Sequence, residues 1–474
     1  MPEATQDGYP TWMGMVFVFN LIIGTGALTL PAAFAKAGWL GGSIMVLLVG
    51  FVSYITVTFV IEAMASANAI LHLRSVLKRR VARNRPGASD SDSDPDAAEN
   101  SPLVSEEGSA FSLTTRVEMG EMATIYFTGG GVAVFYLCLA IYLYGDLSIY
   151  AAAIGTSLKD VICSAGNVTD PHAPCWPDHS FTRTDCYRSC VVATGLILGP
   201  FVFFNVQKTK YIQILTVIFR WCAFTAMIVM ATSRLIQDGV QGHPDAVTPS
   251  GIPSLFGTCI YSFMCHHSLP SLLAPVREKR HLAWQLPVDF ILIAIFYILL
   301  ALTGVFAFDR LDDLYTLNFL ESPGEGFTRV IDYFLALFPV FTLSASLPIV
   351  AITLRNNLEA ILVAGRQSSV TSRALLPLVA LVPALVVTLL TDSLSSLVGF
   401  TGTYAGAGVQ YITPVALVYC ARRQMRDIMP LLSPENPHRS PFQGNKWLLM
   451  VIAWCALGVI LVTVNFFTRV AHPP

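Results

Sequence analysis

Long apolar runs, separated by charged or Pro/Gly-rich stretches, recur from one end of this sequence to the other. A helix needs about 20 mostly apolar residues to cross the hydrocarbon core of a bilayer. Runs of that kind lie at residues 13–35, 40–64, 131–156, 187–205, 212–234, 254–275, 287–308, 329–354, 373–391, 395–420 and 447–468. Charged residues make up only 13% of the chain, about half the share usual in soluble domains. The pattern predicts an all-α integral membrane protein with about 11 transmembrane helices, its membrane domain covering residues 13–468.

The distribution of basic residues predicts how the chain is oriented. Short loops on the cytosolic side of a membrane are enriched in Lys and Arg. If residues 1–12 are cytosolic, most of the 29 Lys and Arg residues in this chain fall on the cytosolic side. An odd number of spans then places the C-terminus outside the cell or in a lumen. No basic residue precedes Lys36, so the first run lacks the charged start of a signal peptide, and we expect it to be retained as a span.

The loop at residues 157–186 falls on the far side of the membrane in this orientation. It carries the sequon Asn167-Val168-Thr169, so we expect a glycan at Asn167. It also carries Cys163, Cys175 and Cys186, with Cys190 shortly after, and cysteines in a non-cytosolic loop are suited to form disulfides. We expect Cys163 to pair with Cys175; free thiols at the start of the fourth span are the alternative.

One long polar segment, residues 73–116, lies on the cytosolic side between the second and third spans. Basic residues come first, and a Ser/Asp-rich stretch at 86–96 follows, with too little apolar content to offset the entropy of ordering. We expect a disordered insertion that offers sites to cytosolic sorting or signalling proteins. Residues 99–104 resemble an acidic dileucine sorting signal, which favours endosomes and lysosomes over the plasma membrane. The net charge of −2 gives no reason to expect nucleic-acid binding.

The first apolar run contains Gly24, Gly26 and Pro31. An interior glycine costs a helix about 1 kcal/mol relative to alanine, and a proline costs about 3 kcal/mol. We therefore expect this span to be broken near the middle of the membrane. Close packing of small residues between helices is the alternative for an isolated Gly-x-Gly.

A second interruption occurs five spans later, where Tyr261 to Pro270 place a polar cluster and a proline inside the sixth run. Transporters built from inverted repeats have one discontinuous span in each half, and the half-helix ends form the binding site. Spans one to five and six to ten would then form two repeats, with the eleventh span as an addition. The matched spacing favours a transporter over simple small-residue packing.

The first break offers groups of both polarities. Unpaired amides of Gly24, Thr25 and Gly26, at the N-terminal end of a half-helix, favour an anion such as a carboxylate. The carbonyls that the break frees suit an ammonium group or a metal cation. An α-amino acid carries both charges, and we expect its site to include Ile23 and His266 beside these three residues.

Ionisable residues inside spans are costly and are therefore functional candidates. We expect His266, His267 or Asp146 to carry a coupled proton. Histidine hydrogen-bonded between helices is one alternative, and a structural pairing of Asp146 with Arg220 in the fifth span is another. Five acidic residues near span ends are expected to be solvated: Glu62, Glu118, Glu121, Asp289 and Asp332.

The eighth run places hydroxyl groups at every second residue, on Thr342, Ser344 and Ser346. Together with Asn20 and the freed carbonyls of the first span, these hydroxyls suit a small hard cation such as Na⁺. Hydrogen bonds from the hydroxyls to their own helix are the alternative.

Three of these stretches resemble signatures of the amino acid/auxin permease family. The pattern Asn20-x-x-x-Gly24-x-Gly26-x-Leu28-x-x-Pro31 resembles its first-span motif, residues 263–270 are similar to its sixth-span motif, and residues 399–419 resemble its tenth span. The resemblance implies a LeuT-like 5+5 inverted repeat with broken spans 1 and 6, moving amino acids with Na⁺ or H⁺. By position, Asn20, Ser344 and Ser346 match the cation site of the family, and residues 24–26 match its carboxylate site. The long loops after the second and third spans depart from the family pattern.

The sequence therefore predicts a secondary active transporter of amino acids or similar small zwitterions, coupled to H⁺ or Na⁺ and working by alternating access. The alternative is a transporter-like solute sensor or scaffold that signals through its cytosolic loop. We expect no enzymatic activity and no cofactor, since the chain carries no paired metal-ligand spacing, phosphate loop or nucleophile motif.

Overall fold

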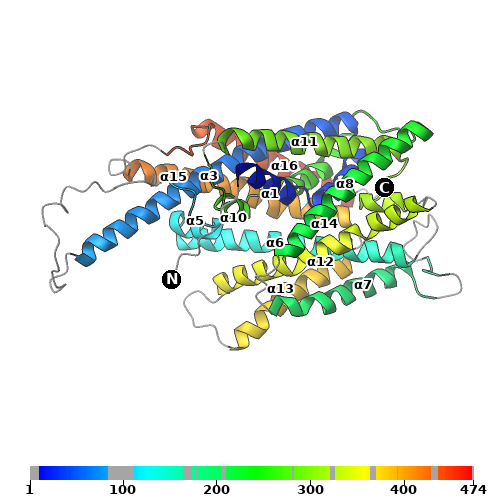
Figure 1. Cartoon of the computed structure of the whole chain (residues 1–474), viewed down its shortest axis with the longest axis horizontal. Coiled ribbons are helices and arrows are strands. Elements are labelled where there is room, and N and C mark those ends of the chain that lie inside the picture. Colours follow the sequence, from blue (N-terminus) through cyan, green and yellow to red (C-terminus); the bar gives the residue numbers. More distant parts are fainter. Residues whose placement is uncertain are drawn as a thin grey trace.

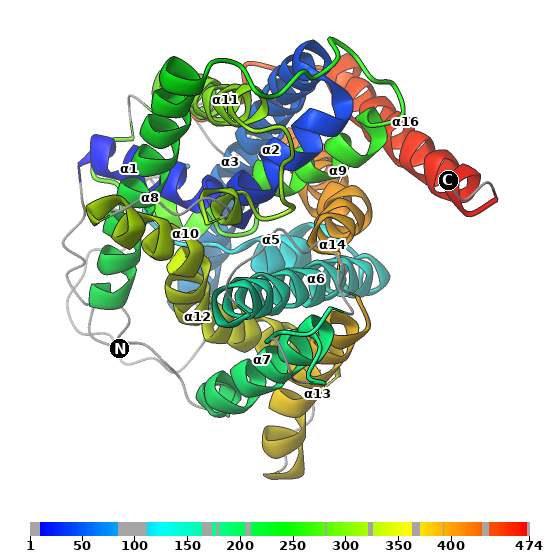
Figure 2. The same cartoon turned by 90° about the vertical axis from the view of Figure 1, so that its right-hand side faces the viewer.

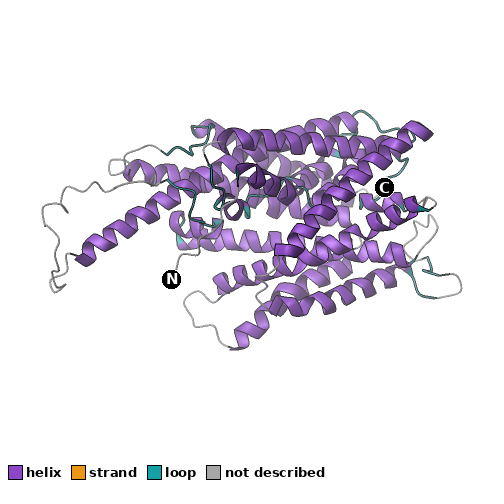
Figure 3. Ribbon diagram, viewed as in Figure 1, coloured by secondary structure: helices purple, strands orange, loops and turns teal. Residues whose placement is uncertain are grey.

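The computed structural model describes residues 10–83, 111–163, 173–176, 180–203, 210–279, 282–320, 326–362, 370–391, 393–428 and 436–471. In these ranges the chain is almost entirely helical (Figures 1 and 3), and the described residues contain no strand beyond one isolated bridge between Pro174 and Thr182. The expectation of an all-α chain is confirmed. The glycosylation sequon at Asn167, the Ser/Asp stretch and the sorting motif lie outside the described residues.

The helices follow the predicted apolar runs closely. Their bounds are α1 Thr11–Ile22, α2 Thr25–Ala37, α3 Trp39–Arg83, α5 Met119–Tyr126, α6 Gly129–Ile162, α7 Arg183–Leu198, α8 Lys210–Asp238, α9 Ile252–Ser262, α10 Leu269–Leu273, α11 Leu282–Ala307, α12 Phe327–Leu362, α13 Val370–Leu390, α14 Leu394–Thr401, α15 Thr413–Ile428 and α16 Asn445–Ala471. Short helical turns lie at η1 Gly199–Phe203 and η2 Tyr315–Phe319, and the π-helical turns η3 Gly402–Gly406 and η4 Gly408–Ile412 join α14 to α15.

Seven described helical segments are long and apolar enough to cross a membrane. They are Trp39–Arg79, Gly129–Ile162, Arg183–Phe203, Leu215–Asp238, Trp284–Ala307, Phe327–Leu362 and Asn445–Thr468. The pair α1 and α2 passes the same test as one span bent by 54°, which raises the number to eight. The chain is therefore a multi-pass helical membrane protein.

The outer helices present their apolar side chains to the surroundings. In the most apolar windows of α8 and α16 only 22% of residues are buried, and both helices lie at the edges of the bundle in Figure 2. Large exposed side chains such as Ile236 and Phe467 would be unfavourable in water but are suited to lipid.

Helix α3 is longer than the predicted span and projects beyond the bundle in Figure 1. It continues as helix through residues 73–83, so the predicted loop begins as helix in its described part.

Glycines allow α9 to approach the π-helical segment very closely. A Cβ on Gly402 would lie 2.0 Å from the backbone oxygen of Gly257, which leaves no space for a side chain. Likewise, a Cβ on Gly257 would lie 2.3 Å from the backbone oxygen of Gly399. Since only glycine fits at such distances, these residues fix α9 against the tenth apolar run. This contact holds the second interrupted helix in the centre of the bundle.

Candidate functional site

The first predicted break is present at the expected residues. Helix α1 ends at Ile22 and α2 begins at Thr25, so Ile23 and Gly24 lie between two half-helices. The Gly24 amide bonds to the Ile22 carbonyl at 2.9 Å instead of continuing the helical ladder. A Cβ on Gly24 would meet only the Leu21 carbonyl oxygen, at 4.0 Å, so there is open space beside this residue. The break therefore leaves room for a small group.

The second predicted break is present as well. Helix α9 ends at Ser262 and α10 begins at Leu269, and residues 263–268 form turns. The Met264 amide bonds to the Tyr261 carbonyl at 3.3 Å, and the Ser268 amide bonds to the Cys265 carbonyl at 3.1 Å. Helix α2 packs along α9, which brings the two interrupted helices side by side.

Tyr297 joins the two breaks. Its side chain, on α11, is fully buried, and its hydroxyl oxygen lies 2.9 Å from the Ile22 carbonyl oxygen and 2.8 Å from the Ser262 carbonyl oxygen. These are the last carbonyls of α1 and α9, which have no partner in their own helices. The Ile22 carbonyl also accepts the Gly24 amide at 2.9 Å, and the one hydroxyl proton of Tyr297 is shared between the two carbonyls. Nothing in the sequence indicated this role, since a tyrosine inside an apolar run usually indicates packing.

Arg220 on α8 caps the end of α1. Its Nη1 donates to the Asn20 carbonyl at 2.5 Å and lies 3.3 Å from the Ile23 carbonyl. A cation at a helix C-terminus is favoured by the helix dipole and by the unpaired carbonyls there. Among the described residues Arg220 forms no ion pair with Asp146, so the alternative of a structural pairing between the two was wrong. The freed carbonyls of α1 hold the guanidinium instead.

Asp146 on α6 is connected to both breaks through tyrosines. Its Oδ1 accepts a hydrogen bond of 2.5 Å from the Tyr261 hydroxyl, one residue before the end of α9. Tyr150, one turn further along α6, lies beside Asp146, Thr25 and Arg220. A buried polar path therefore runs from the first break through Tyr150 and Asp146 to the second break. The sequence identified Asp146 but neither tyrosine.

The two histidines occupy different positions. His266 is fully buried, and its Nε2 lies 2.8 Å from the Thr56 hydroxyl on α3. His267 is partly exposed, and its ring centroid lies 5.5 Å from that of Tyr142 on α6. The hydrogen bond of His266 corresponds to the alternative of a histidine held between helices.

Three of the expected cation ligands make hydrogen bonds within their own helices, which corresponds to the alternative for the hydroxyl groups. The Asn20 amide donates to the Val16 carbonyl at 2.8 Å, Thr342 to Phe338 at 2.9 Å and Ser346 to Thr342 at 3.1 Å. All three bonds lie within the residue's own helix. In the described part of the chain no hydrogen bond joins Asn20 to Thr342, Ser344 or Ser346, and α12 packs mainly on α6, α8 and α13.

Three of the acidic residues expected in water are buried, and that expectation was wrong for them. Asp289 and Asp332 are 5% and 1% exposed, and Glu62 is 3% exposed. Glu62 on α3 binds Arg422 on α15 through both carboxylate oxygens, at 2.9 and 2.7 Å, and it accepts the Ser440 amide at 3.0 Å. Burial of a carboxylate requires this kind of pairing. Glu62 was expected to reach water because it lies near the end of a predicted span. Helix α3 continues well beyond that point and places the Glu62 carboxylate inside the bundle.

A cavity of about 330 Å³ lies at the end of the bundle where α6 ends and α14 begins. It lies between the end of α6, residues 311–317 and the start of α14, and Thr156, Lys159, Asp160 and Asp313 contribute to its walls. Asp313 binds Lys36, at the end of α2, at 3.3 Å and accepts the Ser395 amide at 3.2 Å. These contacts tie the half-helix after the first break to α14.

Two interrupted helices that meet around buried polar groups in a multi-pass bundle are typical of membrane transporters. A family model described as transmembrane amino acid transporter protein matches residues 8–70 and 114–427 of this chain. The chain belongs to that family.

The relatives that match almost the whole chain are named transmembrane protein 104 or transmembrane protein 104 homolog. The chain is 48% identical to the transmembrane protein 104 homolog of Drosophila melanogaster over 97% of both chains. It is 46% identical to transmembrane protein 104 of Homo sapiens over 98% of both chains. With the transmembrane protein 104 homolog of Dictyostelium discoideum the identity is 32% over 98% of both chains. These names state no substrate.

Proposed function

We propose that the protein is a secondary active transporter of α-amino acids or similar small zwitterions that works by alternating access. The single observation that carries the proposal is the position of the Tyr297 hydroxyl, which lies within hydrogen-bond distance of the last carbonyl of α1 and the last carbonyl of α9. Movement of either half-helix changes this shared contact. Membership of the transporter family supports the same function.

The architecture that we propose has eleven spans in a LeuT-like 5+5 inverted repeat. In it, α1 with α2 is the broken span 1, and α9 with α10 is the broken span 6. The support is that both interruptions occur at corresponding places in the two halves and lie side by side in the bundle. Under this topology the Cys163 end of α6 is extracytosolic, which is consistent with its disulfide. A lysosomal or endosomal location is the preferred one, with the plasma membrane as the alternative.

The substrate site that we propose lies at the first break. Helix α2 begins without a side-chain cap, so its first amides, from Thr25 and Gly26, are available to a carboxylate. Ile23 and the open space beside Gly24 complete the wall of this pocket. His266 would then lie on the side of the second break.

For the coupled ion we propose H⁺. The carbonyls of Asn20 and Ile23, which would otherwise attract a metal cation, already hold the guanidinium of Arg220. A permanent cation at this point takes the place of Na⁺, so a site built from Asn20 with Thr342, Ser344 and Ser346 becomes the less favoured choice. Asp146 is the preferred proton carrier because it contacts both interrupted helices through tyrosines; His266 and His267 are the second choice.

Solute counterflow in proteoliposomes tests the proposal. The purified full chain is first screened for exchange of a panel of radiolabelled amino acids. Exchange of the substrate identified in this way is then measured in the Tyr297→Phe variant. This variant keeps the ring but loses the hydroxyl, so we expect exchange to fall about tenfold, the equivalent of about 1.4 kcal/mol.

Tyr144→Phe is the matched control, because its hydroxyl donates to the Val379 carbonyl at 2.6 Å, away from both breaks. Equal loss in the two variants would contradict a special role for Tyr297. Binding of an amino acid without any exchange would instead support the alternative of a solute sensor that signals through the cytosolic loop.

A further inference from the structure

Four cysteines lie together where α6 ends and α7 begins. Cys163 is the C-terminal cap of α6, Cys175 lies in the short segment that follows, and Cys186 and Cys190 are on consecutive turns of α7. All four are buried and form a small cluster of their own, apart from the main core. Cys163 and Cys175 are joined by a disulfide, with their Cα atoms 4.6 Å apart, as the sequence led us to expect.

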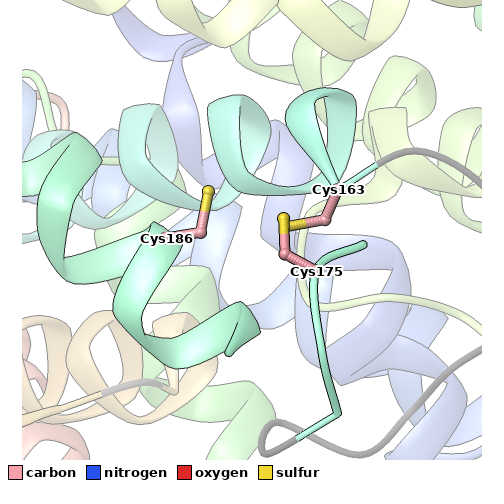
Figure 4. Close-up of side chains that lie close together, drawn as sticks. All are labelled: Cys163, Cys175 and Cys186. Carbon is pink, nitrogen blue, oxygen red and sulfur yellow. A yellow bond between two sulfur atoms is a disulfide. The ribbon is translucent and has the colours of Figure 1, made fainter. Parts of the chain in front are cut away.

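The thiol of Cys186 lies beside this disulfide (Figure 4). Its sulfur lies within 4.8 Å of both bonded sulfur atoms, whereas Cys190 is not part of this group. The basic side chains of Lys159 and Arg183 lie near Cys186, and both pair with Asp160, at 3.1 and 2.5 Å. Cations beside a thiol favour its thiolate, which is the form that attacks a disulfide. Burial of the Cys186 thiol outweighs this effect and Asp160 opposes it too, so the observation that favours exchange is the proximity of the three sulfur atoms.

We propose that Cys186 exchanges with the Cys163–Cys175 disulfide. The Cys186 thiolate forms a bond to one of the two sulfur atoms, the existing sulfur–sulfur bond breaks, and its electron pair leaves on the other sulfur. That sulfur takes up the proton that Cys186 released. The step consumes no oxidant and no reductant. Two of the three sulfur atoms are bonded to each other and are not thiolate ligands, so the geometry points to exchange and not to a metal site.

Exchange would change which elements are tied together. A Cys163–Cys186 bond links the end of α6 directly to the first turn of α7, and a Cys175–Cys186 bond links α7 to the intervening segment. The same turn of α7 carries Arg183, whose partner Asp160 lies in the wall of the cavity between α6 and α14. The state of the thiols would thus act on one wall of that cavity. The inference is independent of the proposed transport function.

The first test uses the wild-type full chain in lipid nanodiscs. The protein is held at pH 8, quenched with acid at intervals, treated with N-ethylmaleimide under denaturing conditions and digested for peptide mapping. We expect peptides linked through Cys186 to appear beside the Cys163–Cys175 peptide, while Cys190 is recovered fully alkylated. Quantitative alkylation of Cys186 at every time point would overturn the proposal.

The second test removes one partner of the disulfide. In Cys175→Ala, treated with oxidised glutathione as a disulfide oxidant, we expect Cys163 to be recovered bound to Cys186. The matched control is Cys175→Ala with Cys186→Ala, in which Cys163 should not pair with Cys190. A monodisperse Cys175→Ala protein that keeps Cys163 as a free thiol, or pairs it with Cys190, refutes the exchange. The wild-type measurement needs no substitution, so misfolding of a variant does not remove the test.

Discussion

Gly26 of α2 packs against Ser262 at the end of α9 so closely that a Cβ on Gly26 would lie 2.6 Å from the Ser262 Cα. The neighbour is backbone, which cannot rotate away as a side-chain tip can. Thus the glycine of the first interrupted helix is required by the second interrupted helix, and the two breaks form one structural unit. A relative movement of the two half-helices must either keep this contact or separate them completely.

Gly26→Ala is therefore expected to destabilise the protein. The added methyl group forces α2 away from α9, and overpacking of this kind typically costs about 1–3 kcal/mol. We expect a lower midpoint of thermal unfolding, measured by size-exclusion chromatography after heating in detergent, together with reduced counterflow.

Gly24→Ala is the matched control for Gly26→Ala, since its methyl group would meet only the Leu21 carbonyl oxygen at 4.0 Å. We expect this variant to keep its thermal midpoint but to exchange substrate more slowly, because the methyl group takes up the open space of the proposed pocket. If the two variants lose stability equally, the contact between Gly26 and Ser262 is not what limits the packing.

Replacement of Arg220 tests whether a fixed cation serves in place of Na⁺. We expect wild-type uptake to be the same in Na⁺ and in choline buffer. Arg220→Gln removes the charge from the Asn20 and Ile23 carbonyls, and hydrogen bonds from charged groups are worth about 1.5–3 kcal/mol. Uptake should therefore fall at least tenfold, by radiolabelled flux at equal protein density. Wild-type uptake that requires Na⁺ would contradict this assignment.

The ion pair between Glu62 and Arg422 should matter for stability more than an exposed pair does. Removing one partner of a buried pair leaves the other charge uncompensated, at a cost of roughly 3–5 kcal/mol. Glu62→Gln is thus expected to lower the thermal midpoint by several degrees, and Glu62→Gln with Arg422→Gln should recover part of the loss.

Asp238→Asn provides the comparison, because Asp238 pairs with Arg234 at 3.9 Å on an exposed surface. Such pairs contribute about 0–1 kcal/mol, and we expect no measurable change in the midpoint. Two equal shifts would show that the burial of Glu62 has no special consequence for stability.

The parts of this protein that could be predicted from its sequence are those decided by neighbouring residues. Apolar runs of membrane length indicated the positions of the helices. Two glycines and a proline in the first run, and a polar cluster with a proline in the sixth, indicated the breaks, because both effects act over a few turns. The partners could not be predicted in the same way. Tyr297 and Ile22 are 275 residues apart in the chain, and Arg422 and Glu62 are 360 apart, so each pairing depends on how complete helices pack. For Arg220, a count of intramembrane charges suggested Asp146 as the partner. The break predicted free carbonyls at the end of α1, but no local pattern reveals that Arg220, 200 residues away, is the cation they hold.

Asp146 offers the most direct test of proton coupling. Its carboxyl group lies within 2.5 Å of the Tyr261 hydroxyl at the second break and beside Tyr150 near the first. Asparagine matches the shape of a protonated aspartic acid but cannot release a proton. Asp146→Asn should therefore still exchange labelled for unlabelled substrate in counterflow, yet fail to accumulate substrate when an inward proton gradient is imposed. Both quantities are measured on the same proteoliposomes, with the pH gradient set by buffer dilution.

A parallel variant, His266→Gln, separates the two candidate carriers. Because the Nε2 of His266 lies 2.8 Å from the Thr56 hydroxyl, we expect glutamine to preserve part of this contact and the response to the gradient to remain. Should accumulation survive in Asp146→Asn and disappear in His266→Gln, the proton carrier is the histidine and not Asp146. Loss of counterflow in Asp146→Asn would mean that the carboxylate binds the substrate's ammonium group itself, because exchange requires binding but no net movement of protons.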